Sequence, residues 1–268
     1  MSLGIAFKGP EGVVLAADSR VTLTGTLPDG TKVPSSFDNA TKLLEIRGHG
    51  YVGVVTFGQG AIGTGQGQRT AHSYLPELEQ RLAGRARLSI EEFAREVGDF
   101  FLAQWIAASM PADADPMCFL FGGYDAGETY GRVYQVVVPA APIPSEQNPN
   151  EFGLTFGGQT EVTNRLLAGY DPQALEIART TLGLSDGQVQ GLAQALRALQ
   201  LSIPMPFLPL QDCVDLAIFI IQTTATLQTW IVGVRGVGGA IDVATITRTE
   251  GFRALQRKQV SGSKIHQR

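Results

Sequence analysis

The sequence is short of the residues from which metal sites and disulfide frameworks are built. Its 268 residues include two cysteines, Cys118 and Cys213, and three histidines, His49, His72 and His266. Each cysteine lies in an apolar run, so we expect two buried thiols rather than a disulfide framework or a metal signature. Histidines this scattered argue against a histidine metal site or a histidine-based triad. The sequence therefore predicts a protein with no metal and no cofactor.

The chain is also poor in charge. Charged residues make up 17% of it and its formal net charge is -4, which argues against nucleic acid or an anionic membrane as the main partner. The first residues lack the pattern of a signal peptide, and no apolar run reaches transmembrane length. We therefore expect a cytoplasmic protein that binds neither nucleic acid nor membrane.

Glycine, by contrast, is abundant at 32 residues, which is typical of a chain with many short strands and turns. Hydrophobic residues make up 44% of the chain, enough for a sizeable core. Apolar periodicity and turn residues together indicate where the elements lie. The expected strands are 3–8, 12–18, 41–46, 51–57, 117–124, 131–138, 152–156, 230–234 and 240–247, and the expected helices are 68–83, 89–109, 160–168, 172–182, 185–201 and 211–229.

The order of these elements predicts the fold class. Strands and helices come in blocks rather than in alternation, which favours an α+β fold: a four-layer αββα sandwich of two antiparallel sheets between helix layers. No internal repeat or linker divides the sequence, so we expect a single domain over residues 1–268. Residues 21–38 and 139–149 are expected to be exposed loops, and the polar, basic residues 256–268 a flexible tail.

The residue with the most chemistry is Ser2. It follows Met1, and its side chain is small enough that a methionine aminopeptidase normally removes the methionine before it. The mature chain would then begin with a serine that carries both a hydroxyl and a free α-amine, a nucleophile and a base in one residue. The pKa of an α-amine is about 8, so a usable part of it is neutral at physiological pH. The plainer interpretation is an ordinary second residue.

Asp18 and Lys42 are a second candidate pair, because a buried acid and a buried lysine are costly unless they meet. Asp18 ends one apolar run and Lys42 opens another, so both are expected to point inward at the same end of a sheet. They form either a structural salt bridge or a site in which Asp18 holds Lys42 beside the nucleophile, whose pKa the lysine lowers. The residues alone leave both interpretations open.

Gly58, just after the expected strand 51–57, is the third candidate. A glycine lets a backbone N–H approach a developing oxyanion closely, although the same position also suits a turn glycine. Residues 58–63 match the Gly-x-Gly-x-x-Gly pattern of dinucleotide sites. Two successive helices are expected next, and no strand-end acid follows, so the nucleotide-binding interpretation fails.

The run Gly12-Val-Val-Leu-Ala-Ala-Asp18-Ser-Arg20, shortly after a candidate N-terminal nucleophile, resembles the opening of proteasome β-type subunits. These subunits and the bacterial proteasome-like proteins belong to the N-terminal nucleophile hydrolase superfamily. The resemblance implies that Ser2 takes the place of the family's threonine nucleophile, and that Asp18, Lys42 and Gly58 complete the catalytic set. It also implies a substrate pocket that accepts an uncharged side chain before the scissile bond. The positions of that pocket are small and mostly apolar: Val21, Ala40, Leu44, Thr56 and Gly60.

Two supporting features of that family have no match. Its Ser-Gly-Ser falls on Gly157-Gly158-Gln159, and its supporting aspartate falls near Val234, with Arg235 beside it. The resemblance still implies hydrolysis of amide or peptide bonds through a Ser2 acyl-enzyme after Met1 removal. It further implies a self-assembled homo-oligomeric ring or barrel that acts on peptide or unfolded protein, and it identifies no ATPase partner. Two alternatives stay open: a catalytically inactive structural ring subunit, and a non-proteolytic amidase of small molecules.

Overall fold

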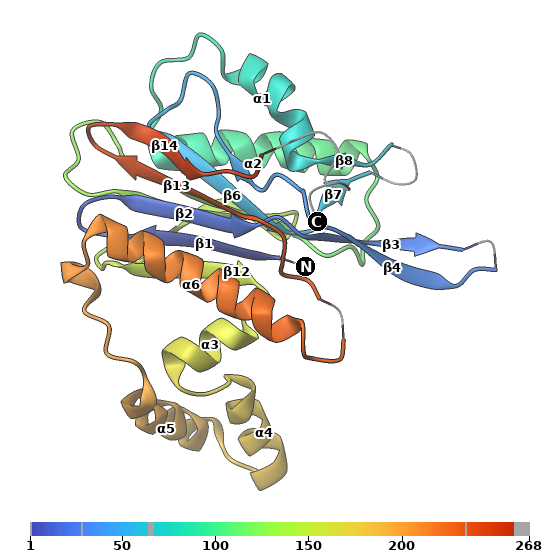
Figure 1. Ribbon diagram of the computed structural model, residues 1–268, viewed down its shortest axis with the longest axis vertical. Helices are drawn as coiled ribbons and strands as arrows, with labels where there is room; N and C mark the ends of the chain where they lie inside the picture. Colours follow the sequence, from blue (N-terminus) through green and yellow to red (C-terminus); the bar gives the residue numbers. More distant parts are fainter. Residues whose placement is uncertain (1, 28, 64–66, 234, 260–268) are drawn as a thin grey trace, which may run out of the picture.

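Two five-stranded antiparallel sheets, stacked face to face, form the centre of the structure (Figure 1). The structure is a computed structural model and describes residues 2–27, 29–63, 67–233 and 235–259. The strand order of the first sheet is β12 (Gly153–Gly158), β1 (Leu3–Lys8), β2 (Val13–Asp18), β13 (Ile241–Thr247) and β14 (Gly251–Gln256). That of the second is β11 (Ala141–Gln147), β10 (Arg132–Val138), β9 (Met117–Gly123), β6 (Val52–Gly58) and β5 (Leu43–Leu44).

Helices cover the outer faces of both sheets (Figure 1). Three clusters of buried side chains separate the layers, one between the sheets and one between each sheet and its helices. The predicted α+β sandwich of two antiparallel sheets between helix layers is therefore confirmed. The short helix η2 (Ala71–Tyr74), α1 (Leu75–Leu82) and α2 (Ile90–Ala107) cover the second sheet, and α3 (Glu161–Ala168) and α6 (Leu210–Gln228) cover the first.

The strands β1 and β2 lie at the centre of the first sheet, and every residue of both is buried. The second sheet covers one face of this pair and α6 covers the other, so both faces must be apolar. That requirement explains why both strands are continuous apolar runs in the sequence rather than alternating patterns. Their register places Gly4 opposite Ala17. Ser2, directly before β1, therefore lies close to Asp18, the last residue of β2.

Two segments expected to be loops form strands instead. Residues 21–38 contain the hairpin of β3 (Val21–Thr26) and β4 (Lys32–Phe37), which projects from the sandwich near the N-terminus (Figure 1). Cross-strand pairs such as Thr22 with Ser36, whose hydroxyls are 3.0 Å apart, stabilise this hairpin despite the turn residues around it. The other segment forms β11, an edge strand, where prolines are tolerated because the outward N–H positions need no partner strand.

Other boundaries also differ from the prediction. Of the strand predicted at 230–234, residues 230–233 form a turn and bends, and Val234 lies outside the described residues. The strand β14 was not predicted. The helix expected from residue 68 starts later, because β7 (Ala61–Ile62) and β8 (Arg69–Thr70) pair first. Of the tail predicted at 256–268, residues 260–268 lie outside the described part of the chain.

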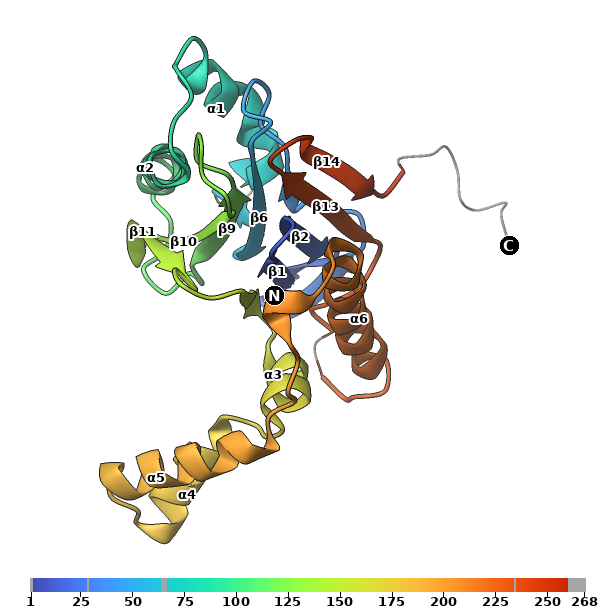
Figure 2. The ribbon, with the colours of Figure 1, turned by 90° about the vertical axis from the view of Figure 1, so that its left-hand side faces the viewer.

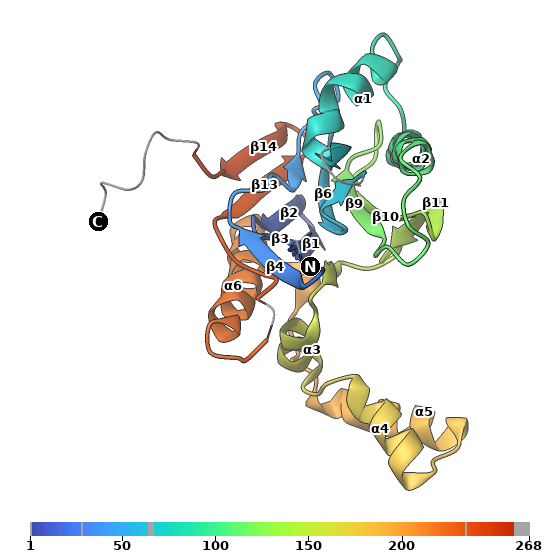
Figure 3. The same cartoon turned by 90° about the vertical axis from the view of Figure 1, so that its right-hand side faces the viewer.

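Between α3 and α6 the chain leaves the sandwich as a projecting arm, residues 172–201 (Figures 2 and 3). The arm consists of α4 (Gln173–Leu182), α5 (Asp186–Leu196) and the short helix η3 (Arg197–Leu199), and the chain returns through η4 (Met205–Phe207). Neither α4 nor α5 has a buried residue. Because short helices gain most of their stability from packing an apolar face, the arm is poorly packed within its own chain.

Helix α6 corrects the expectation that no apolar run reaches transmembrane length. By length and composition it is the one helix in the described residues that could cross a membrane, with 19 residues and a mean hydropathy of 1.2. Its inner face packs on the first sheet through Cys213, Ala217 and Ile221. A helix that buries one face in a core reaches the same composition, so its hydropathy has an explanation within the sandwich.

Candidate functional site

A hollow lies at the amino end of β1, beside Ser2. It is formed by the residue before β1, the start of β3, the segment before β5, the end of β6 and the start of η2. Its enclosed space is about 20 Å³, roughly enough for one water molecule. Lys42 carries the one charged side chain in its lining. The lining residues are Ser2, Val21, Ala40, Thr41, Lys42, Thr56, Phe57, Gln59, Gly60, Thr70 and Ala71.

Most of the predicted site residues are in this lining: Ser2, Lys42, Val21, Ala40, Thr56 and Gly60. Leu44 is not among them. The strand β5 sends Leu43 into the cluster between the sheets and Leu44 into the cluster beneath α1 and α2, because successive side chains of a strand point to opposite faces. Leu44 is therefore a core residue.

Asp18 lies behind the hollow and is 1% exposed. Its carboxylate accepts hydrogen bonds from Lys42 Nζ at 2.7 Å and from the backbone N–H groups of Leu3 and Arg20, each at 3.1 Å. The Gly238 N–H donates a fourth, at 3.0 Å. Each carboxylate oxygen thus has two donors, and Asp18 ties β1, the start of β3 and the loop before β13 to one point.

Lys42 reaches the hollow with its ammonium group held on two sides. Its Nζ donates to Asp18 Oδ1 and to the backbone carbonyl of Arg20. Burial lowers the pKa of Lys42, Asp18 opposes that shift, and the positive charges of Lys258 and Arg20 add to it. A lysine so placed presents a positive charge, or at higher pH a neutral amine, to the space that it shares with Ser2.

Gly58 ends β6 between Phe57 and Gln59, which line the hollow, although Gly58 itself does not. Its φ is +82°, in the region that favours glycine. A Cβ atom at this position would overlap the carbonyl oxygen of Pro116. The backbone here requires glycine for a local reason, whatever chemistry its N–H performs.

The contacts that hold Ser2 from the other side come from Gly158 and Gln159, where the family resemblance had placed an unmatched supporting Ser-Gly-Ser; the contacts themselves were not predicted. The Ser2 carbonyl accepts a hydrogen bond from Gln159 N at 2.7 Å. The preceding residue, Gly158, has a φ of +99°, and a Cβ atom there would overlap the Ser2 carbonyl oxygen. The side chain of Gln159 meets that of Gln228 at the end of α6. Gln228 is far from both Ser2 and Gln159 in the sequence, so only the folded chain shows its part in these contacts.

Lys258 is a second feature that the sequence did not reveal. Its Nζ donates to the Ala40 carbonyl and to Asp242 Oδ2, both at 2.8 Å. Its backbone N–H donates to Asp242 Oδ1 at 2.7 Å. Lys258 belongs to the segment predicted as a flexible tail, yet it is bonded to the segment before β5 that forms one wall of the hollow.

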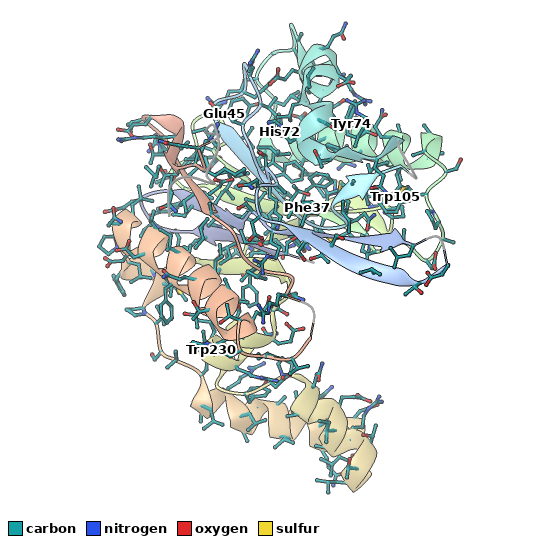
Figure 4. The ribbon with its side chains drawn as sticks, turned by 45° about the vertical axis from the view of Figure 1, so that its right-hand side comes forward. Phe37, Glu45, His72, Tyr74, Trp105 and Trp230 are labelled. Atoms are coloured by element: carbon teal, nitrogen blue, oxygen red, sulfur yellow. The ribbon has the colours of Figure 1, made fainter. Side chains whose placement is uncertain are left out.

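A larger groove of about 580 Å³ lies next to the hollow, and Thr41 belongs to both. Glu45 and His72, both labelled in Figure 4, are among its lining residues. Two ion pairs border the groove: Arg257 with Glu45 at 2.7 Å, and Arg47 with Glu79 at 4.0 Å. The hollow therefore adjoins a polar groove large enough for several residues of an extended chain.

The described residues hold no group of three or more His, Cys, Asp or Glu side chains that could bind a metal ion. Both cysteines are buried and unpaired, as predicted. Burial raises the pKa of each thiol to about 11. Neither thiol is therefore a ready nucleophile at neutral pH.

Comparison with known proteins gives matches among solved structures. No family model and no curated protein matches the chain. An Anbu (Gly-1) mutant from Hyphomicrobium sp. strain MC1 is 16% identical with a TM-score of 0.57, over 98% of this chain and 88% of that one. Anbu (ancestral beta-subunit) from Yersinia bercovieri is 17% identical with a TM-score of 0.56, over 94% and 86%. The helical assembly of the Anbu complex from Pseudomonas aeruginosa is 15% identical with a TM-score of 0.57, over 98% and 88%.

These comparisons correct the family resemblance drawn from the sequence. The identification with proteasome β-type subunits is wrong, because these three similar structures are Anbu proteins. At such low identity the likeness shows the fold alone. The nonapeptide from Gly12 to Arg20 is explained by that fold, since it forms the buried β2 and its Asp18 anchor.

Proposed function

We propose that the chain is a hydrolase of amide bonds whose nucleophile is Ser2, once Met1 has been removed. One observation carries the proposal: Ser2 and Lys42 line the same hollow, and Asp18 both anchors Lys42 and bonds the N–H that follows Ser2. A structural salt bridge requires only the pair. It gives no reason for the ammonium group to share a hollow with the first side chain of the processed protein.

In the proposed reaction the Ser2 Oγ attacks the carbonyl carbon of the amide, and its proton passes to the α-amine through a water. The family resemblance assigns stabilisation of the resulting oxyanion to the backbone at Gly58, which lies between Phe57 and Gln59 in the wall of the hollow. The C–N bond then breaks, the departing amine takes the proton, and an ester remains on Ser2. A water adds to the ester carbonyl with the α-amine as base, which releases the acid and restores the serine.

Lys42 acts in this scheme through its charge. An ammonium group beside Ser2 favours the alkoxide character that develops on Oγ during attack. It also disfavours protonation of the α-amine, which keeps that amine available as a base near neutral pH. Asp18 holds Lys42 in place, and its four hydrogen bonds are in turn the reason that the carboxylate stays fixed.

The proposed substrate is an extended peptide or an unfolded protein. The wall residues Val21, Ala40, Thr56 and Gly60 are small and uncharged, which suits an uncharged side chain before the scissile bond. The neighbouring groove gives room for further residues of the same chain. An enzyme of small amides would have little use for that second, polar groove.

Labelling with a β-lactone tests this proposal. The lactone ring opens on a nucleophilic hydroxyl and leaves an ester, so a mass increase on Ser2 reports its reactivity. We expect labelling of the Met1-free chain and none of Ser2→Ala. The labelling rate should rise with pH through the α-amine pKa, about 8 or somewhat lower, because only the neutral amine accepts the proton. A rate that is flat between pH 6 and 9, or equal labelling of Ser2→Ala, contradicts the proposal.

We further propose that copies of the chain assemble, and that the arm of one copy packs on α6 of another. The arm exposes large apolar side chains, including Ile177 at 59% and Leu182 at 70%. Phe219 on α6 and Trp230 in the turn after it border a shallow, uncharged hollow of about 420 Å³, and Figure 4 labels Trp230 at this end of the helix. Two uncovered apolar surfaces on one chain are satisfied together when copies associate. The similar Pseudomonas aeruginosa protein is described as a helical assembly.

Charged substitutions in the two surfaces should break the assembly. We expect Leu182→Asp in the arm and Phe219→Asp on α6 each to shift the protein to smaller species in sedimentation velocity, because each places a charge in an apolar contact. Gln190→Asp, at an exposed position of α5, is the matched control and should sediment like the wild type. Unchanged sedimentation of both apolar variants would contradict this contact.

A further inference from the structure

Gln228, the last residue of α6, joins two segments that each touch the nucleophile's surroundings. Its Nε2 donates to Gln159 Oε1, just after β12, and its Oε1 accepts from Val237 N at 2.9 Å. A glutamine amide has one donor side and one acceptor side, and this one uses both. Gln228 is therefore a bridge between the end of β12 and the loop before β13.

Both ends of this bridge continue into the candidate site. On one side, Gln159 N donates to the Ser2 carbonyl at 2.7 Å. On the other, Gly238, which follows Val237, donates to Asp18 Oδ2 at 3.0 Å and accepts from Ser19 N at 3.1 Å. The bridge thus connects two backbone segments: the one whose Gln159 N–H bonds Ser2, and the one whose Gly238 N–H bonds Asp18.

The peptide plane between Ser2 and Leu3 is fixed at both of its polar atoms. Its carbonyl oxygen is bonded by Gln159 N, and its N–H donates to Asp18 Oδ1 at 3.1 Å. Because a peptide unit is planar, these two bonds fix the plane that carries Ser2. Two rotations of Ser2 remain: rotation about its Cα–C bond moves the α-amine, and rotation about χ1 moves Oγ. Any shift of Gln159 tilts this plane and moves both reacting groups together.

We propose that the Gln159–Gln228 bridge is a positioning device: by holding the Ser2–Leu3 peptide plane, it sets where the α-amine and hydroxyl of Ser2 lie relative to the hollow. The inference rests on the proposed function, since it assigns the bridge a role in the Ser2 reaction. An uncharged bridge suits that role, because it fixes the position of the peptide plane without adding a charge that would change the basicity of the amine. A purely structural bridge would stabilise the end of α6 and leave Ser2 unaffected.

Two substitutions at Gln228 separate these roles. Gln228→Leu keeps the size of the side chain and removes both bonds, and we expect β-lactone labelling of Ser2 to slow by about 10- to 100-fold. Gln228→Glu keeps an acceptor for Val237 N, and Gln159 can rotate its amide to donate to the new carboxylate. A negative charge there raises the pKa of the α-amine, so labelling should persist with its pH profile moved to higher pH.

Gln211→Leu is the matched control. Gln211 lies at the other end of α6, is exposed, and donates from its side chain to Asp215 Oδ1 at 2.9 Å. Gln211→Leu changes the same residue type on the same helix as Gln228→Leu and also removes a side-chain hydrogen bond, but Gln211 has no contact with the site. Its labelling rate and pH profile should match the wild type.

A second measurement keeps the inference testable whatever the chemistry of Ser2. In ¹⁵N NMR spectra, Gln228→Leu should shift the backbone amides of Leu3, Gln159 and Gly238, and Gln211→Leu should not. Unlabelled wild type would overturn the hydrolase, and a shifted Leu3 amide would then still show that the bridge holds the Ser2–Leu3 peptide in place. Two results would overturn the positioning role of the bridge. One is a wild type that labels while both Gln228 variants keep its rate and pH profile, and the other is Leu3 and Gly238 amides that do not shift in Gln228→Leu.

Discussion

Replacement of Lys42 by methionine will lower the free energy of unfolding by about 3 kcal/mol and abolish labelling of Ser2 by a β-lactone. Methionine keeps most of the length of the buried side chain and removes the charge. Asp18 is then left at 1% exposure without its ion-pair partner. Three backbone N–H groups still bond its carboxylate, so the loss should lie at the lower end of the range for a broken buried pair.

The two readouts in this experiment report different things. Loss of stability alone is the result of a structural salt bridge, whereas loss of labelling in protein that is still folded shows that the charge acts on Ser2. Urea unfolding gives the first and the mass of the labelled chain gives the second. Arg165→Met is the control, because Arg165 pairs with Asp171 at 2.6 Å but is 62% exposed. An exposed pair contributes less than about 1 kcal/mol, so this variant should label normally.

Gly158→Ala should have an effect at least as large. The φ of +99° at Gly158 is unfavourable for alanine, and the new Cβ atom would overlap the Ser2 carbonyl oxygen. The strand end or Ser2 must therefore move. We expect a loss of about 3 kcal/mol or more in the free energy of unfolding, and a chain that no longer labels at Ser2.

Gly48→Ala isolates the backbone contribution to that loss. Gly48 has a φ of +80°, and a Cβ atom there meets nothing within 4 Å. Gly48→Ala should therefore lower the free energy of unfolding only by the conformational strain, about 1 kcal/mol, and leave labelling of Ser2 unchanged. Equal losses in the two variants would show that the close approach to Ser2 contributes nothing.

The sandwich could be predicted because its central strands carry the information locally. β1 and β2 are buried on both faces, so their residues are apolar in unbroken runs that end at turn residues. The hairpin of β3 and β4 was missed for the opposite reason. It projects from the sandwich, and its sequence mixes threonine with glycine, proline and aspartate, which is also the composition of an exposed loop.

The candidate site also contains residues that the sequence predicts and residues that it does not. Ser2, Asp18 and Lys42 are close to apolar runs whose ends mark the edge of a sheet, so their meeting could be predicted. Leu44 was placed in the pocket, but an alternation of faces in the two-residue strand β5 puts it in the core. The bonds of Gln228 to Gln159 and of Lys258 to Ala40 join segments that are distant in the sequence. No local pattern marks such contacts, because they depend on how α6 and β14 pack.

The role of Ser2 as a processed N-terminal nucleophile can be decided by the mass of the N-terminal peptide after treatment with a peptidyl epoxyketone. This probe bonds to a hydroxyl and a free amine on the same residue. We predict a chain that begins at Ser2 and carries the probe on that residue, with no adduct on Lys42→Met. A purified chain that retains Met1, or a chain that begins at Ser2 and stays unmodified, would contradict the proposed chemistry.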